Sequence, residues 1–356
     1  MWKEERLSEI ADIYKGAGIS KDQLSDNGEP CILYGELYTK YKTETITEVI
    51  SRTDIDNTKL VRSKANDVII PCSGETAEDI ATARCVIKDG ILLGGDLNII
   101  RLHNYDGSFV SYQLNGKRKY DIAKVAQGVS VVHLYGEHLK GVKTVNPCLA
   151  EQKKISRFLS LLDERIAVQN RLIDRLQSLM IGIAQKIAHS NKPNVRISDC
   201  LECSSSALQE SEVNKTGKYP VYGANGIVGY IDKYHTQNEA IYIIKDGSGV
   251  GGVSYVTGKC SSTGTLNILQ AKNGHSLKYL YYLLKVFNFV PYKTGMAIPH
   301  IYFKDYGKAK IFCPAYPEQL EYAKLLSSID GNLRIALDSL KNFNLQKQYL
   351  LRHMLI

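Results

Sequence analysis

Two short motifs have the letters of a nucleotide-binding or catalytic site. Gly247–Gly252 reads Gly-Ser-Gly-Val-Gly-Gly and matches the dinucleotide-binding pattern GxGxxG. That pattern functions between a strand and a helix, with an acidic residue about 20 positions further on; here a strand-like segment, 253–256, follows, and the next acidic residue is Asp305. Asn146-Pro147 lacks the second proline and the aromatic residue of an amino-methyltransferase motif. We therefore expect no catalytic residue and no cofactor, and at Gly247–Gly252 a β-turn or a close approach of backbone to a ligand.

The cysteines and histidines are not spaced as metal ligands. Cys200-Leu-Glu-Cys203 is a lone CxxC pair with no second pair and no histidine pair nearby, and the eight histidines form no cluster in the sequence. We therefore predict no metal site and reduced thiols. Met1–Arg6 contains no secretion signal, and no apolar segment is long enough to cross a membrane. These features predict a cytoplasmic protein without a membrane partner.

Glycine-rich polar loops are the places where this chain could bind a ligand. In segments such as 15–21 and 34–42, lysine alternates with tyrosine, serine, threonine and glycine. Basic side chains neutralise phosphate groups, and Asn, Gln, Ser and Tyr side chains hydrogen-bond to base edges. A net charge of +8 fits a polyanionic partner, although such loops are also common as solvated turns. The candidate DNA-binding residues are Lys15, Ser20, Lys21, Tyr38, Lys40, Lys42, Arg118, Lys119, Tyr222, Asn225, Lys245, Lys293, Thr294 and His300.

Short β-branched runs separated by turn residues would position these loops. Helices are expected around Leu7–Tyr14, Thr76–Ala83 and Leu277–Phe287. The predicted strands are Val68–Ile70, Ile91–Leu93, Leu97–Ile100, Val129–Val132, Ala240–Ile244, Val253–Val256 and Leu266–Leu269.

The chain repeats itself after Gly128 at a constant offset of 167 residues, so that Gly128 matches Gly295. The match continues without gaps for about sixty residues, which means that the connecting loops have equal lengths. Earlier segments match at other offsets, for example Arg6–Glu9 with Arg196–Asp199. The ends of the two copies are thus alike and their middles differ, which favours one scaffold carrying two different readers over simple divergence after duplication. Further matched pairs are His133 with His300, Tyr135 with Tyr302, Pro147 with Pro314, Gln152 with Gln319, and Asp163 with Asp330.

Two segments, 148–190 and 315–356, predict long helices. Apolar residues recur in them every three or four positions, which places them along one seam, with Lys347 as the charged exception in the second helix. A helix of about 40 residues is about 60 Å long and cannot bury its stripe within one small domain. We expect the two helices to form an antiparallel coiled coil; the alternative is that each folds back on its own domain. The seam residues are Ile155, Phe158, Leu162, Ile166, Ile173, Leu176, Met180, Ile183 and Ile187 in the first helix, and Tyr322, Leu325, Ile329, Leu333, Ala336, Leu340, Phe343, Leu350 and Met354 in the second.

The predicted fold is α+β with a pseudo-twofold internal repeat: two similar globular α/β domains, 1–147 and 191–314, separated by two long antiparallel coiled-coil helices. The order of these features resembles the specificity subunit of type I restriction–modification systems over nearly the whole chain. Each matching segment is short, and their order and duplication make the resemblance specific. In the first copy, Gly128–His133 departs from the pattern because it lacks the proline found at Pro299. The matching segments are Pro147–Ile155, Pro314–Gln319, Phe158–Asp163, Leu325–Asp330 and Thr294–Ile301.

The resemblance implies that 1–147 and 191–314 are target-recognition domains, each reading one half of a bipartite double-stranded DNA site. It implies that two methyltransferase subunits dock around the helical spacer and that translocase–endonuclease subunits join afterwards. Methylation and cleavage would then belong to partners, and this chain would not be an enzyme. Two other functions stay open: a free-standing DNA-binding or regulatory protein, and a coiled-coil interaction scaffold without DNA binding. A catalytic methyltransferase is disfavoured because its cofactor and catalytic motifs are missing.

Overall fold

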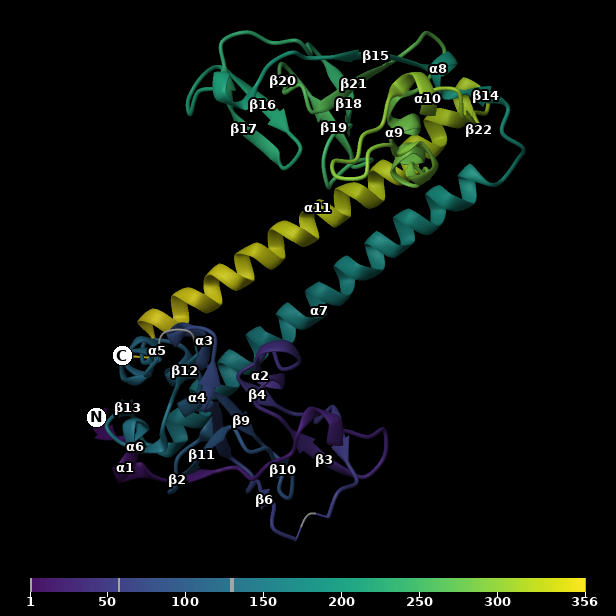
Figure 1. Ribbon diagram of the computed structural model, residues 1–356. Helices are drawn as coiled ribbons and strands as arrows, with labels where there is room; N and C mark the ends of the chain where they lie inside the picture. The colour runs from purple at the N-terminus through teal and green to yellow at the C-terminus, as the bar shows by residue number, and fades with distance from the viewer. Residues whose placement is uncertain (1, 57, 129–130, 356) are drawn as a thin grey trace. The chain divides into compact units, whose positions relative to one another are not determined.

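The computed structural model describes residues 2–56, 58–128 and 131–355, which form two compact units (Figure 1). Unit 1 comprises Met1–Asn170 together with Ser339–Ile356, and unit 2 comprises Arg171–Asp338. The C-terminal end of the chain therefore belongs to the first unit.

Unit 1 is built on two larger β-sheets. In sheet order, the five-stranded sheet contains β2 (Ala11–Lys15), β11 (Leu97–Leu102), β7 (Asp67–Pro71), β9 (Arg84–Val86) and β4 (Thr45–Ile46), and the four-stranded sheet contains β5 (Ser51–Thr53), β3 (Glu29–Ile32), β10 (Leu92–Leu93) and β6 (Val61–Arg62). Successive side chains of β7 point to opposite faces. Val68 and Ile70 therefore join the core that contains Phe109, whereas Ile69 joins the core that contains Ile32 of the other sheet. Burial on both faces explains why this strand is a continuous apolar run in the sequence.

Smaller elements complete unit 1. Helix α4 (Gly107–Asn115) begins after Asp106, whose carboxylate accepts a hydrogen bond from the Phe109 N–H at 2.7 Å. The helix predicted around Leu7–Tyr14 is wrong beyond Ile10, because the following residues pair with β11 and strand pairing outweighs local helix preference. The remaining elements are the strand pairs β1 (Lys3–Arg6) with β13 (Lys143–Asn146) and β8 (Ser73–Gly74) with β12 (Val132–His133), the helices α1 (Leu7–Ile10), α2 (Glu36–Thr39), α3 (Ala77–Ile80), α5 (Lys119–Val125) and α6 (Gly136–Leu139), and the 3-10 turn η1 (Lys21–Gln23).

Unit 2 follows the same plan. In sheet order, its four-stranded sheet contains β15 (Leu201–Ser205), β21 (Leu266–Ala271), β18 (Glu239–Ile244) and β19 (Val253–Thr257). Its three-stranded sheet contains β17 (Gly226–Ile231), β16 (Tyr219–Gly223) and β20 (Ser261–Ser262). Separately, β14 (Val195–Arg196) pairs with β22 (Lys310–Ile311). The order β15-β21-β18-β19 reproduces β2-β11-β7-β9, and the parallel pair β16–β20 reproduces β3–β10. The internal repeat is therefore confirmed as a repeat of topology. The helical elements are α8 (Ile197–Cys200), α9 (Leu277–Lys285), α10 (Phe303–Tyr306), η2 (Glu210–Glu212) and η3 (Val290–Tyr292).

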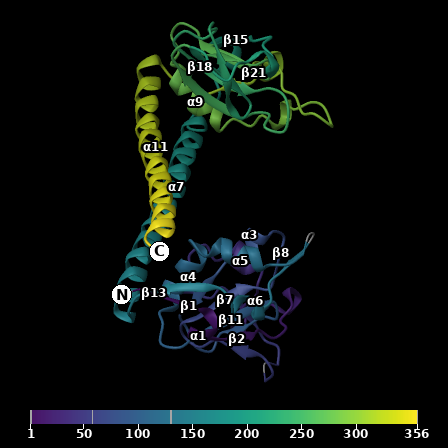
Figure 2. The ribbon, with the colours of Figure 1, turned by 90° about the vertical axis from the view of Figure 1, so that its left-hand side faces the viewer.

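The two long segments are continuous helices, α7 (Leu149–Ala188) and α11 (Tyr316–His353). Helix α7 begins in unit 1 and ends in unit 2, whereas α11 begins in unit 2 and ends in unit 1, so the two helices are antiparallel. Figures 1 and 2 show them side by side in both views. The prediction that their apolar stripes bury each other is confirmed for part of the seam, and most of its other members are half-buried. Its buried members are Leu162, Ile173, Met180 and Ile187 in α7, and Ile329, Leu333 and Ala336 in α11.

One position of the predicted seam is wrong in both helices. Phe158 and Leu325, which are repeat equivalents, are 49% and 48% exposed, whereas Leu159 and Leu326 are 0% and 1% exposed. Near its start, each helix packs on the sheet-and-helix domain that precedes it, and Leu159 is part of the unit 1 core. The buried face is therefore set there by the domain as well as by the partner helix, and an apolar side chain remains on the surface at the same place in both copies.

Two buried glutamines fix the starts of the long helices. The side-chain oxygen of Gln152 accepts a hydrogen bond from the backbone N–H of Asp106, the residue that caps α4, at 2.9 Å. Gln319 does the same for Ser276, the residue that caps α9, at 2.8 Å. Each side-chain amide also donates to the carbonyl of the proline five residues earlier, at 2.8 and 2.9 Å. This double role explains why the Pro-to-Gln spacing is the same in the two copies.

Lys347, the charged residue of the α11 seam, ends in a buried ion cluster of unit 1. Its ammonium lies 2.6 Å from carboxylate oxygens of both Glu44 and Asp163, and the Tyr112 hydroxyl donates to Asp163 at 2.6 Å. Burial opposes the charge, but the two carboxylates outweigh burial and hold the pKa of Lys347 above its usual value. A few residues further on, Leu351 and Leu355 belong to the unit 1 core. The end of the chain thus completes the first unit.

We predict that Lys347→Met destabilises unit 1 by roughly 3 kcal/mol or more, because it leaves two carboxylates buried without their cation. Trp2, the single tryptophan, packs against Phe109 in unit 1, so tryptophan fluorescence during urea unfolding reports on that unit. Lys341→Met, at an exposed position of the same helix, is the matched control and should change little. Adding Glu44→Gln and Asp163→Asn to Lys347→Met should recover part of the loss. Equal effects of the two lysine substitutions would contradict the cluster's role.

Candidate nucleic-acid interface

The loop between η3 and α10 in unit 2 presents apolar side chains to solvent from an ordered base. The backbones of Thr294 and His300 exchange two hydrogen bonds, at 2.9 and 2.7 Å. Gly295 has a φ of +86°, and a Cβ there would lie 2.4 Å from the Ile298 carbonyl oxygen, so no other residue fits without rearrangement. Met296 is fully exposed and Ile298 is mostly exposed. An apolar tip held in this way is typical of a binding surface.

Asp246 anchors this loop to the sheet. His300 Nδ1 lies 2.7 Å from one of its carboxylate oxygens, and Lys245 Nζ lies 2.9 Å from the other. Burial acts to raise the pKa of Asp246, but the hydrogen bonds from His300 and Lys245 outweigh it and hold this pKa below its usual value. The Gly247 N–H donates to the Pro299 carbonyl at 3.0 Å. The segment Gly247–Gly252 is therefore the turn between β18 and β19, and the strand predicted after it is confirmed.

The first copy contains the equivalent loop. Gln127 and His133 exchange backbone hydrogen bonds at 2.9 and 2.7 Å, and Gly128 has a φ of +121°. His133 Nδ1 lies 3.4 Å from the Ser73 hydroxyl, in the position that corresponds to the His300–Asp246 contact. Of the strand predicted at Val129–Val132, residues 129 and 130 lie outside the described residues, and β12 begins at Val132. The base of the loop is thus shared by both copies although the proline is not.

A cavity of about 760 Å³ opens beside this loop in unit 1. Its lining includes Tyr38, whose hydroxyl donates to the Ser73 carbonyl at 3.0 Å, together with the carboxylates of Glu75 and Asp79. Lys42 Nζ donates to the Tyr38 carbonyl at 2.8 Å and supports the same wall. Carboxylates accept hydrogen bonds from the amino groups of cytosine or adenine. A search of the sequence for cations misses these acceptors, because nothing in the sequence places 75–79 next to Tyr38.

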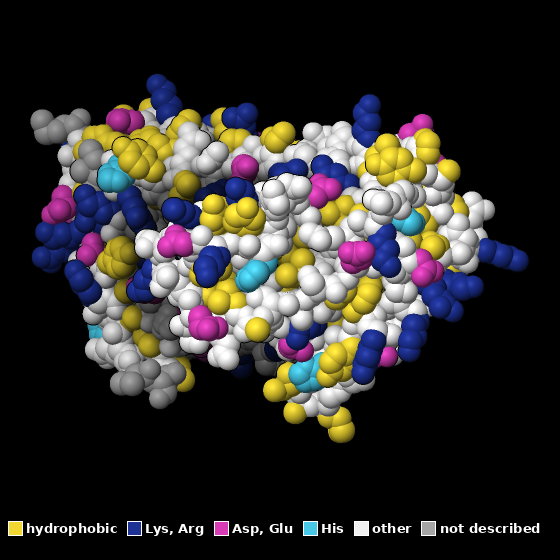
Figure 3. Space-filling model, turned by 90° about the horizontal axis from the view of Figure 1, so that it is seen from above, with side chains coloured by type: hydrophobic (Ala, Val, Ile, Leu, Met, Phe, Trp, Pro, Cys, Tyr) yellow, Lys and Arg dark blue, Asp and Glu magenta, His cyan; other side chains and the backbone are white. Residues whose placement is uncertain are grey.

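Five of the candidate cations fall into two groups, exposed and paired. Lys15, Lys21 and Lys293 are exposed, and none forms a salt bridge with any residue that the structure describes. Lys40 and Lys245 are neutralised by neighbouring carboxylates at 2.7 and 2.9 Å. On the face seen in Figure 3, Lys and Arg side chains lie in separate groups among Asp and Glu side chains. Lys15, Lys21 and Lys293 are therefore available to a ligand, whereas Lys40 and Lys245 are paired within the fold.

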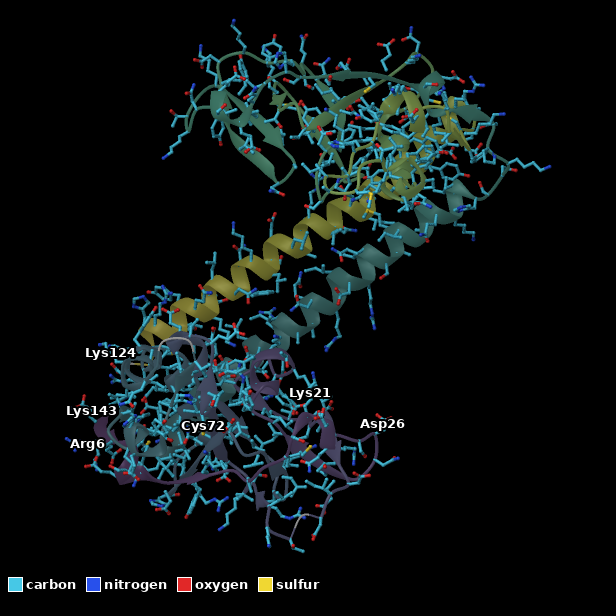
Figure 4. All side chains as sticks on the ribbon, viewed as in Figure 1. Arg6, Lys21, Asp26, Cys72, Lys124 and Lys143 are labelled. Atoms are coloured by element: carbon cyan, nitrogen blue, oxygen red, sulfur yellow. The ribbon has the colours of Figure 1, made fainter. Side chains whose placement is uncertain are left out.

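The remaining candidates of unit 1 are on different flanks. Arg118 is only 14% exposed in its side chain and lies 3.5 Å from Asp121, and Lys119 is the first residue of α5. In Figure 4, Lys124, which belongs to the same helix, lies on the flank of the unit opposite to Lys21. The structure therefore does not bring the α5 candidates together with Lys21.

Three polar candidate residues differ in how accessible their side chains are. Tyr222 packs edge-on against Tyr242 in the unit 2 core, at 5.8 Å between ring centroids. Asn225 is exposed in the turn between β16 and β17. Ser20 hydrogen-bonds to Gln23 at the start of η1. Of these, Asn225 has the freest side chain for contact with a base.

The fold assembles a cluster of potential metal ligands that the spacing of cysteines and histidines in the sequence does not indicate. Cys200, His275 and Cys313 place one potential metal-ligand atom each within 4.8 Å of one another in unit 2. The three residues are far apart in the sequence, so their spacing does not indicate the cluster, and only the folded chain brings them together. Cys203, the other half of the CxxC pair, is not part of it.

Comparison with known proteins identifies the family. The family model described as the type I restriction modification DNA specificity domain matches residues 1–178 and again 190–342. A proposed type I restriction enzyme specificity subunit of Haemophilus influenzae is 25% identical over 123 residues, 34% of this chain and 32% of that protein. The specificity subunit of the type I restriction enzyme EcoprrI of Escherichia coli is 25% identical over 112 residues, 32% of this chain and 28% of its own length. These alignments thus span about a third of the curated relatives.

Solved structures share the fold. The S subunit of a type I restriction–modification system from M. genitalium matches with a TM-score of 0.72 and 18% identity, over 100% of this chain and 96% of that one. A chain from a structural study of type I complex assembly and conformational transition matches with a TM-score of 0.57 and 15% identity, over 98% and 96%. Because the two segments that match the family model, 1–178 and 190–342, together make up most of the chain, this protein belongs to the type I restriction–modification DNA specificity family. In the described part of the chain, no helix has the apolar run that a membrane span requires.

We predict that Gly295→Ala loosens the loop between η3 and α10, because the new methyl group would clash with the Ile298 carbonyl and strain a positive φ. Trypsin should then cleave after Lys293 several-fold faster than in the unsubstituted chain. Gly274→Ala is the control, since Gly274 also has a positive φ (+83°) but only its own chain neighbours lie within 4 Å of the place that its methyl group would take. If both variants were cleaved at the original rate after Lys293, the loop would not depend on this glycine.

Proposed function

We propose that this chain is the DNA-reading subunit of a type I restriction–modification complex and carries no catalytic group of its own. The observation that supports this most is the doubled architecture: one topology occurs twice, and each copy continues into a long helix held by an equivalent buried glutamine. Two readers of the same build with different loops suit a DNA site made of two different halves. In this proposal, 1–147 and 191–314 are the target-recognition domains, and 148–190 and 315–356 are the conserved helices.

DNA contact would come from loops at the strand ends of each unit. Exposed lysines such as Lys15, Lys21 and Lys293 would neutralise phosphates, so affinity should fall steeply as salt rises. The loop that carries Met296, and the cavity beside Tyr38, would lie against base edges, where shape and hydrogen-bond pattern are read. At the tip of the first of these loops the two copies carry different residues, Met296–Pro299 against Val129–Val132, as two readers of different half-sites must.

Two methyltransferase subunits would dock on the helices. Phe158 and Leu325 support this, because they occupy equivalent positions of the repeat and both expose about half of an apolar side chain. A pseudo-twofold chain offers the same surface twice, which suits two copies of one partner. Translocase–endonuclease subunits would join the complex afterwards. Adenine methylation and DNA cleavage would then be reactions of the partners.

Chromosomal adenine methylation tests this function. In cells that express the methyltransferase subunits, we expect one bipartite motif to be methylated only when this chain is present. Phe158→Asp combined with Leu325→Asp should abolish that methylation, while the purified variant still shifts duplex DNA in a gel. Ile87→Asp, at an exposed apolar position directly after β9, should preserve methylation and serves as the control. DNA binding without any chain-dependent methylation would instead indicate a free-standing DNA-binding protein.

The length of the helix pair should set the spacing between the half-sites. Deleting one heptad from each helix, 167–173 and 334–340, keeps the seam in register and shortens the pair by about 10 Å. At 3.4 Å per base pair, the recognised spacer should shorten by about 3 base pairs while the bases of both half-sites stay the same. Mapping the methylated motif of the variant measures both properties. A change in the half-site bases, or an unchanged spacer, would contradict the idea that the helices act as a ruler.

A further inference from the structure

The three residues Cys200, His275 and Cys313 meet where unit 2 joins its long helix. Cys200 is the last residue of α8, His275 precedes the cap of α9, and Cys313 lies between β22 and α11. Their ligand atoms lie within 4.8 Å of one another, and both cysteines are buried. Thiolate sulfur and imidazole nitrogen are the ligands that Zn²⁺ prefers in proteins.

The backbone around the cluster is fixed before any ligand binds. Asn194 pins Cys313 by accepting from its N–H and donating to its carbonyl, both at 2.8 Å. The Lys272 N–H donates to the Cys200 carbonyl at 2.9 Å. The N–H of the residue after His275 donates to the side chain of Gln319. Such support of each ligand is what a metal site needs to bind without reorganising the fold.

The imidazole of His275 gives a second, independent indication. Its Nδ1 atom is buried and has no hydrogen-bond partner among the described residues. A buried nitrogen without a partner costs free energy, and each such atom in a folded protein requires an explanation. A metal ion bound directly to this nitrogen would supply one.

The first copy holds the same junction together with different chemistry. The residues equivalent to Cys200, His275 and Cys313 are Ile10, Tyr105 and Asn146, as aligned by α1 with α8, by the caps of α4 and α9, and by β13 with β22. Tyr105 and Asn146 both hydrogen-bond to the Glu5 carboxylate, at 3.0 and 3.1 Å.

Unit 2 cannot form that polar network. The residue equivalent to Glu5 is the apolar Val195, as the paired strands show: Glu5 lies opposite Thr144 and Val195 lies opposite Ile311. The second copy has thus lost the carboxylate that ties the junction in the first copy, and it has two thiols and an imidazole around the same place.

We infer that Cys200, His275 and Cys313 bind a structural Zn²⁺ ion that ties α8, the start of α9 and the start of α11 together. Three protein ligands leave one tetrahedral position for water or a small exogenous ligand. The inferred role of this site is structural and involves no contact with nucleic acid, so the inference does not depend on the proposed function.

Metal analysis of the purified, tag-free chain tests the site. We expect about one zinc ion per chain by mass spectrometry of the metal content. Cys200→Ser, His275→Gln and Cys313→Ser should each reduce it several-fold, whereas Cys203→Ser, the neighbouring thiol outside the cluster, should retain it. A zinc content near zero in the unsubstituted chain, or equal loss in the Cys203 variant, would overturn the inference.

A second measurement needs no variant and covers the case in which the substituted chains fail to fold. The unsubstituted chain is stripped with a chelator and titrated with Co²⁺, whose bound form should show the intense visible bands of a tetrahedral thiolate complex. If disulfide mapping without reductant found a Cys200–Cys313 disulfide, and the cobalt titration gave no such spectrum, the inferred metal site would be overturned and the two cysteines would form a disulfide instead. DNA binding enters neither readout, so failure of the site and failure of the proposed function are distinguishable.

Discussion

The structure depends on one requirement: the last turns of α11 must return to the first unit and bury Lys347 among its carboxylates. Unit 1 is not closed by residues 1–170, because Leu351 and Leu355 are part of its core and Glu44 and Asp163 need the cation that α11 brings. An unpaired buried carboxylate costs several kcal/mol, so loss of this contact would strongly destabilise the unit. The contact between Glu44 and Lys347 joins residues 303 positions apart in the sequence. Folding of the first unit therefore cannot finish until α11 has been made, and contacts of such long sequence separation form slowly.

The same requirement explains which parts of the two copies stay alike. A helix that crosses from one unit to the other must start at a defined point and angle, and Gln152 and Gln319 provide this by bonding the helix start to the cap of the domain helix. Any change in the Pro-to-Gln spacing would break one of the two bonds of each glutamine. The loops beyond the strand ends do not help to position a long helix. They are free to differ, and this is where the two copies do differ.

Periodicity and strong local signals made most of the fold predictable from the sequence. The long helices and the apolar strands β7, β11, β18 and β21 follow from local spacing and composition, whereas Leu7–Tyr14 was predicted as one helix because pairing with β11 is not visible locally. The seam was misplaced by one residue at Phe158, since the domain surface that buries Leu159 comes from distant segments. The site was less predictable for the same reason. Residue type marked Lys40 and Lys245 as candidates, but only the structure shows that carboxylates neutralise them.

The two units hold the start of their long helix to the rest of the domain by two different kinds of interaction. In unit 1 the Glu5 carboxylate gathers Tyr105 and Asn146 by hydrogen bonds, which reform whenever the chain refolds. In unit 2 the cluster of Cys200, His275 and Cys313 would be tied by metal–thiolate bonds, which require both the ion and reduced sulfur. Such a tie supplies its stabilisation only in the folded chain, because the unfolded chain does not hold three ligands within one coordination sphere. The stability of the junction at the start of α11, unlike that at the start of α7, would then depend on the supply of metal and on the redox state of the surroundings.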